Sequence, residues 1–197
     1  MATPAEIAAY RQANAGLVAL MERDLNAFWA SLNLARPERV RDALIQFVPF
    51  LTAQYGEIAA AIAADWFDQL RIQAAQDGLF RMVGAAARFR SALAPVTPAD
   101  VMQRQVRFGA QHLFTDDPEQ TLVFLRGETQ KYVLQPGRDT ITQNSTRDRV
   151  AKGWRRVVRA GGCDWCHKLS SRGAVFKEST VAFDAHHDCN CTGVPTW

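Results

Sequence analysis

The first thirty or so residues place apolar and polar side chains with the period of an α-helix. Apolar side chains recur at steps of three and four residues, at Ile7, Tyr10, Ala13, Leu17, Met21, Leu25, Phe28 and Leu32. Such a stripe covers one side of a helix, and the charged residues 22–24 fall largely off it. The start Thr3-Pro4-Ala5-Glu6 has the form of a capping box with proline at the first helical position. The pattern predicts an amphipathic helix that begins here.

A second helical stripe opens at Pro37 in the same way. Its apolar positions are Val40, Leu44, Phe47, Leu51 and Tyr55, and past Gly56 the pattern resumes at Ile58, Ile62, Trp66 and Leu70. Pro49 predicts a kink, because a proline ring inside a helix blocks a backbone hydrogen bond. The alanine-rich residues 59–65 allow a neighbouring helix to approach closely. We interpret the aromatic residues of the stripe as core packing and not as a ligand site.

The remaining pattern predicts shorter elements. We expect helices over residues 80–93, from Ala99 through Val106, and from Glu119 towards Tyr132, with a break at Pro136-Gly137 and a last polar helix over 139–151. After Gly153 the β-forming residues Trp154, Val157 and Val158 predict a strand, and residues 174–176 a second short strand.

Composition is that of an ordinary soluble globular protein, with 48% hydrophobic and 22% charged residues. Polar residues interrupt every apolar stretch before it reaches the roughly 18–20 residues that span a bilayer, so we expect no membrane span. The N-terminal sequence has neither the basic start nor the apolar middle of a secretory signal, which predicts synthesis in the cytoplasm.

All four cysteines fall in the last 35 residues, which in a reducing compartment indicates metal or redox chemistry before disulfides. Cys163 and Cys166 stand at the spacing at which a tight turn brings two sulfurs onto one metal. A second group begins 19 intervening residues later, with His186, His187, Cys189 and Cys191. Zinc prefers four tetrahedral sulfur or nitrogen ligands, and two such groups separated by a loop are the usual sequence form of its sites.

We therefore predict a structural zinc site drawn from Cys163, Cys166, His186, Cys189 and Cys191. Cys163 and Cys166 are the firmest ligands, and Cys191 or His187 competes for the fourth position beside His186 and Cys189. So full a site leaves no open position for catalysis. The predicted fold class is mainly α: an N-terminal helical region, residues 1–137, followed by a small α+β C-terminal zinc-binding module, residues 138–197.

Other chemistries fit the cysteines less well. The motif Cys163-x-x-Cys166-His167 matches c-type haem attachment, which belongs to exported proteins, and a thioredoxin-like pair needs a βαβ context. A zinc deaminase needs a His-x-Glu element and a proline before its cysteine pair, and neither is present. A zinc-supported nuclease of the His-Asn-His type, with Asp184, His186 and His187, stays open as an alternative, although His186 could not both bind zinc and activate water.

Positive charge gathers just before the first cysteine pair. The basic residues are Arg147, Arg149, Lys152, Arg155, Arg156 and Arg159, against Asp148 alone, in a chain whose formal charge is +3. Such a stretch is either a solvated face or a surface for phosphates or an acidic protein. It also leaves open a zinc-ribbon protein that binds DNA, whose affinity would fall steeply with salt.

The C-terminal sequence resembles MuF-like minor capsid proteins, also called phage head morphogenesis proteins, of the actinobacteriophage type. The resemblance rests on the segments 153–158, 163–166, 171–176 and 186–191, and the helical residues 17–29 and 55–66 look like the same group. Many relatives end in His-Pro-x-Cys-x-Cys. In this sequence His187 occupies the position of that proline, so the resemblance assigns no role to His187.

The resemblance implies a virion protein that is not an enzyme. Such a protein joins the procapsid near the portal, contacts the portal protein or the major capsid protein, travels inside the head and assists assembly or genome delivery. The basic stretch would then face packaged DNA or an acidic portal surface. We expect the chain in the host cytoplasm during assembly and inside the capsid afterwards.

Overall fold

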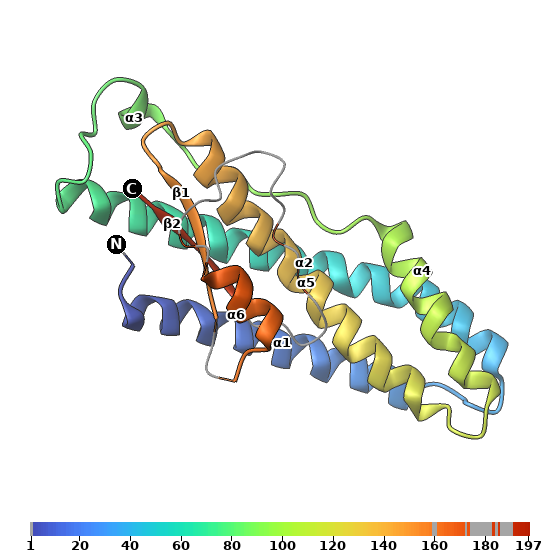
Figure 1. Cartoon of the computed structure of the whole chain (residues 1–197). Helices are drawn as coiled ribbons and strands as arrows, with labels where there is room; N and C mark the ends of the chain where they lie inside the picture. The colour runs from blue at the N-terminus through green and yellow to red at the C-terminus, as the bar shows by residue number, and fades with distance from the viewer. Residues whose placement is uncertain (1, 159–160, 172, 174–182, 184, 186–190) are drawn as a thin grey trace.

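The computed structural model describes residues 2–158, 161–171, 173, 183, 185 and 191–197 (Figure 1). The elements in chain order are α1 (Pro4–Ala30), α2 (Pro37–Gln76), α3 (Ala85–Arg88), α4 (Ala99–Gly109), the 3-10 helix η1 (Ala110–Phe114), α5 (Glu119–Arg147), β1 (Gly153–Val157), α6 (Asp164–Ser170) and β2 (Thr192–Thr196). The described chain is mainly helical, as the sequence predicts, with a small C-terminal strand pair. The second strand of the pair, β2, is not predicted by the sequence pattern.

The start of α1 confirms the predicted capping box. The Glu6 backbone N–H donates to the Thr3 hydroxyl at 3.3 Å, and the Thr3 backbone N–H donates to the Glu6 carboxylate at 2.7 Å. Both bonds satisfy amides that a helix start otherwise leaves without partners. Thr3 and Glu6 therefore fix where the helix begins.

The long helices α1, α2 and α5 lie along one another, and α4 packs beside the start of α2 (Figure 1). Their shared core includes the fully buried side chains Met21, Leu25, Leu44, Val48, Met102, Val106 and Leu125. A second cluster joins the start of α1 to the later part of α2 and to the end of the chain, and it includes Tyr10, Trp66, Phe67, Ile141, Val194 and Trp197. Most of the predicted apolar stripes are therefore core, including Trp66, whose ring stacks on Tyr10 at 4.2 Å, whereas Ala13 and Ile58 are exposed.

Helix α5 runs without a break through Pro136 and Gly137, so the break expected there is wrong. A proline inside a helix leaves the carbonyl four residues earlier without its intrahelical partner. That carbonyl belongs to Tyr132, and it accepts a hydrogen bond from the Thr97 hydroxyl at 3.1 Å. The polar helix expected over residues 139–151 is the last part of α5, and the expected boundary after residue 137 lies inside this helix.

The helix expected over residues 80–93 is also wrong, because in that range only Ala85–Arg88 is helical. The Asn144 side chain accepts from the Ala92 backbone N–H at 2.9 Å and donates to the Ala92 carbonyl at 2.8 Å. Arg71 donates to the Ala86 carbonyl at 2.8 Å. These tertiary bonds occupy backbone groups that a continuous helix would use itself.

The strand expected after Gly153 is confirmed as β1, which pairs antiparallel with β2. The register sets Gly153 opposite Thr196 and Val157 opposite Thr192. The pair lies on α5, where Val194 joins the same apolar cluster as Ile141. The strand expected over 174–176 lies outside the described residues.

By length and composition alone, α2 could cross a membrane. In the structure 56% of its most apolar window is buried by the rest of the chain, as in the core helix of a soluble protein. This is weak support for a membrane span.

Candidate functional site

Cys163 and Cys166 lie at the start of α6, just after the Gly161-Gly162 turn. Gly161 has a φ of 77°, a left-handed conformation that glycine adopts without strain. Cys163 is the N-cap residue, and its sulfur accepts the Cys166 backbone N–H at 3.5 Å. The turn between them thus directs a backbone N–H at the first sulfur.

Cys191 meets Cys166 in a small apolar cluster with Trp154 and Phe183. Cys166 is 1% exposed and Cys191 7% exposed, and the Trp154 and Phe183 rings lie 5.4 Å apart. Cys191 directly precedes β2, and the pairing of Thr192 with Val157 brings it to the end of β1 that leads towards α6. The strand pair therefore brings together cysteines 25 positions apart in the sequence.

The other predicted ligands, His186 and Cys189, lie outside the described residues, as do His187 and Asp184 of the nuclease alternative. Within the described ranges, no three His, Cys, Asp or Glu side chains are grouped so that they could hold a metal ion. The structure thus places Cys166 and Cys191 in one cluster, with Cys163 three positions before Cys166. The zinc ion itself stays a prediction from the chemistry of the donors.

The basic stretch divides into two kinds of residue. Arg147, Arg149 and Lys152 are exposed, while Arg155 is half-buried in β1. Arg156 is buried, with its guanidinium 3.8 Å from the centre of the Phe183 ring and 5.3 Å from that of Trp165. Arg159 lies outside the described residues. Arg156 therefore packs against the aromatic side chains around the cysteines, and the exposed charge lies at the end of α5.

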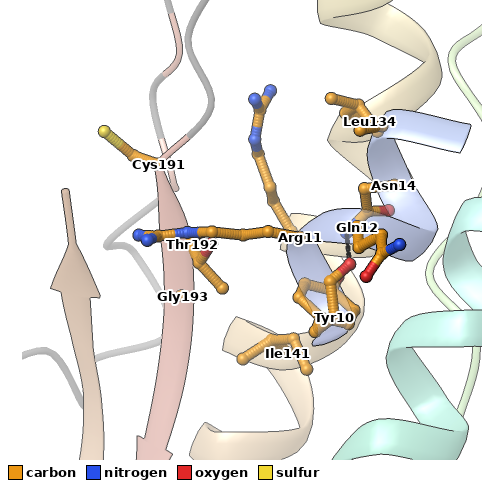
Figure 2. Close-up of a pocket in the computed structure, with 11 residues that line it drawn as sticks. Tyr10, Arg11, Gln12, Asn14, Leu134, Ile141, Cys191, Thr192 and Gly193 are labelled. Atoms are coloured by element: carbon orange, nitrogen blue, oxygen red, sulfur yellow. Dashed lines mark hydrogen bonds between the residues drawn. The ribbon is translucent and has the colours of Figure 1, made fainter. Parts of the chain in front are cut away.

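A cavity of about 280 Å³ lies between α1, α5 and β2 (Figure 2). Its described lining residues are Tyr10, Arg11, Gln12, Asn14, Ala15, Leu134, Arg138, Ile141, Cys191, Thr192 and Gly193. The Cys191 side chain points away from α1 and from the cavity (Figure 2). These lining residues include no carboxylate and no histidine, so they offer neither of the usual general bases.

Arg11 fastens the strand pair to α1 at the edge of this cavity. Its Nε donates to the Thr192 hydroxyl at 3.1 Å and its Nη2 to the Val157 carbonyl at 2.8 Å. Burial raises the pKa of the neighbouring Tyr10, which keeps its hydroxyl protonated. The sequence gives no signal for the role of Arg11, because one polar residue off the apolar stripe looks like any solvated helix position.

A buried ion pair joins the end of the chain to α2 and α5. Arg71 Nε lies 2.7 Å from an Asp148 carboxylate oxygen, and the Trp197 indole donates to the same oxygen at 3.0 Å. The Arg71 guanidinium also lies 4.7 Å from the centre of the Phe89 ring. Asp148, the one acid in the basic stretch, thus holds Trp197 beside the core.

Comparison with known proteins gives one family. The chain matches the family described as VG15 protein over residues 1–197. Neither the curated proteins nor the solved structures contain a match.

Proposed function

This chain belongs to the VG15 protein family and is a viral protein, and we propose that it is a minor capsid protein of a tailed phage. In this proposal it is a head morphogenesis protein of the MuF-like type that joins the procapsid near the portal. It then stays inside the head and assists assembly or genome delivery. The family match over the whole chain is the observation that carries the proposal.

Two further features support it. The cysteine-rich C-terminal sequence resembles MuF-like proteins, and the long helices offer an extended body for contacts with the portal protein or the major capsid protein. In this proposal the function is assembly without turnover. The helical body docks on the shell, and the C-terminal segment packs along the body.

We further propose that a structural zinc ion holds the C-terminal segment. Cys163 and Cys166 supply two ligands, and two more come from His186, Cys189 and Cys191. Zinc would supply the stability that a small segment lacks when it buries little apolar surface. The apolar cluster of Trp154, Cys166, Phe183 and Cys191 has four buried members, which fits this need.

Co-expression with the portal and major capsid proteins of the same phage tests the assembly role. Procapsids are separated on a density gradient and probed for the chain, with an unrelated protein of similar mass as the control for trapping. The proposal expects the chain to sediment with procapsids only when the portal protein is present. Sedimentation with the soluble fraction in both cases would contradict it.

A further inference from the structure

Two segments that are distant in sequence place exposed basic side chains at the same end of the molecule. Arg81, Arg88 and Arg90 come from the chain between α2 and α4, and Arg147, Arg149 and Lys152 come from the end of α5 and the turn into β1. The end of α5 and this turn lie beside α3 (Figure 1). We refer to these six residues as the basic end.

Specific contacts hold the two segments together. The buried Asn144 side chain of α5 makes two hydrogen bonds to the Ala92 backbone, at 2.8 and 2.9 Å. The Arg147 guanidinium lies 5.9 Å from the centre of the Phe89 ring. Arg71, which pairs with Asp148, donates to the Ala86 carbonyl. The fold therefore brings the two groups of basic residues together. Neither segment alone contains all six of them.

Little negative charge offsets the basic end. Within residues 77–92 and 144–152 the acids are Asp77, which is exposed, and Asp148, which is buried and paired with Arg71. The half-buried Asp68 of α2 accepts a hydrogen bond from Ser91 nearby. Six exposed cations in a chain whose net charge is only +3 mean that the rest of the sequence is formally negative. The net positive charge of the chain is therefore concentrated in the basic end.

We propose that the basic end binds the phosphate backbone of double-stranded DNA without reading its sequence. Five of the six cations are arginines, whose planar forks match phosphate oxygens in pairs. The only helix in residues 77–98 is α3, and with four residues it is too short to enter a major groove and contact base edges. The positive charge of the basic end indicates a phosphate-bearing partner. The identification of that partner as packaged DNA rests on the proposed function.

Fluorescence anisotropy with two unrelated DNA duplexes tests the proposal on the full chain. Similar affinities are expected for both sequences. The logarithm of the binding constant should fall linearly with the logarithm of salt concentration, by about 0.9 for each phosphate contact.

The decisive variant combines Arg81→Ala, Arg88→Ala and Arg149→Ala, which draws on both segments. These three side chains make no hydrogen bond, ion pair or ring contact in the part of the chain that the structure describes, so the fold should survive, and circular dichroism checks this. The salt slope should fall by about 2 to 3, and the affinity at low salt at least tenfold, as expected when about three phosphate contacts are lost.

The matched control combines Arg36→Ala, Arg39→Ala and Arg107→Ala, three exposed arginines at the start of α2 and the end of α4. These two helix ends lie at the opposite end of the bundle (Figure 1). The control variant should keep the wild-type slope. Equal losses in both variants, or binding to anionic lipid vesicles or acidic portal protein with none to DNA, would overturn the proposal. Because the assay uses the isolated chain, a chain that binds DNA but is absent from procapsids would contradict only the proposed function.

Discussion

At the scale of single residues, Asp148 has a structural role that the surrounding sequence does not indicate. It stands among six basic residues and looks like an incidental charge on a solvated surface. In the fold its carboxylate is buried, accepts from Arg71 and Trp197, and accepts the Val150 backbone N–H at 3.3 Å. One carboxylate thus joins α2, the turn after α5 and the end of the chain.

Replacing Asp148 by alanine should destabilise the protein strongly. Removal of one member of a buried ion pair costs about 3–5 kcal/mol, because the partner charge stays buried without compensation. Urea unfolding followed by circular dichroism measures the loss. Asp100→Ala is the control, since its pair with Arg104 is exposed and such pairs contribute less than about 1 kcal/mol. Equal losses in the two variants would show that the buried pair is unimportant.

The sequence could not predict this ion pair or the role of Arg11. Arg71 and Asp148 are 77 positions apart, and Arg11 and Thr192 are 181 apart. Apolar periodicity and capping motifs indicate interactions between residues that are a few positions apart in the sequence. These contacts instead depend on how whole helices pack. The cysteines were recognisable because their spacing is local, and Cys163 and Cys166 indeed form one turn.

At the scale of elements, the packing of α5 on α2 depends on a glycine. A methyl group added at Gly137 would lie 2.9 Å from the Ala59 backbone carbonyl oxygen. Backbone cannot move aside as a flexible side chain can, so the two helices would have to separate. The small residues Gly137 and Ala59 therefore set how closely these helices approach.

Gly137→Ala should lower the free energy of unfolding by about 1–3 kcal/mol, the usual cost of overpacking. Gly16→Ala in α1 is the matched control, because nothing lies within 4 Å of the added methyl group. It should stabilise the protein by about 0.5–1 kcal/mol, since alanine favours a helix. Thermal unfolding of both variants measures the contrast, and two shifts of the same sign would argue against close contact of α5 with α2.

A hydrogen bond between α1 and α2 makes stability depend on pH. The Tyr55 hydroxyl donates to the Asp24 carboxylate at 2.6 Å, and this bond, followed by that from Arg23, lowers the pKa of Asp24 below its usual 3.8. A carboxylate whose pKa is lowered by folding stabilises the fold above its usual pKa. That contribution is lost as the pH falls through the lower value.

The difference in urea midpoint between wild type and Tyr55→Phe should therefore shrink as the pH is lowered from about 6 to about 3. Tyr132→Phe serves as the control, because the Tyr132 hydroxyl accepts from Gln105 and that bond involves no carboxylate. Its difference from wild type should not follow the titration of Asp24. If the difference in urea midpoint between wild type and Tyr55→Phe stayed constant over this pH range, the Tyr55–Asp24 hydrogen bond would not be the source of the pH dependence.

The helices themselves were largely predictable, and the exceptions have physical causes. Apolar period and capping residues predicted α1, the start of α2, α4 and the start of α5. Pro136 predicts a break that does not occur, because a donor from another segment, Thr97, satisfies the carbonyl that the proline leaves unpaired. Residues 80–93 form little helix because Asn144 and Arg71 take their backbone groups.

At the scale of the whole molecule, the chain combines a helical body with a cysteine-containing strand unit fastened along it. Arg11 ties the strand pair to α1, and Asp148 ties Trp197 to α2. The body therefore contacts both strands directly. A zinc ion would act on the segment between β1 and β2, where the predicted ligands lie.

Removal of zinc by a chelator should loosen the segment between β1 and β2 and leave α1, α2 and α5 formed. Limited proteolysis should then cut after β1 and before β2, while the helical circular dichroism signal stays close to its starting value. A Cys163→Ser, Cys166→Ser double variant should be cut without chelator and should not respond further to it. If the chelator changes neither proteolysis nor circular dichroism, the structural-zinc proposal fails.

Quantitative mass spectrometry of purified particles from the phage that encodes the chain tests the proposed head location most directly. Particles are first treated with protease, so that only enclosed proteins survive, and the copy number is measured against the major capsid protein. The proposal predicts the chain at a low, constant number of copies per head, protected until the heads are opened. A chain abundant in infected cells and absent from the particles would contradict it.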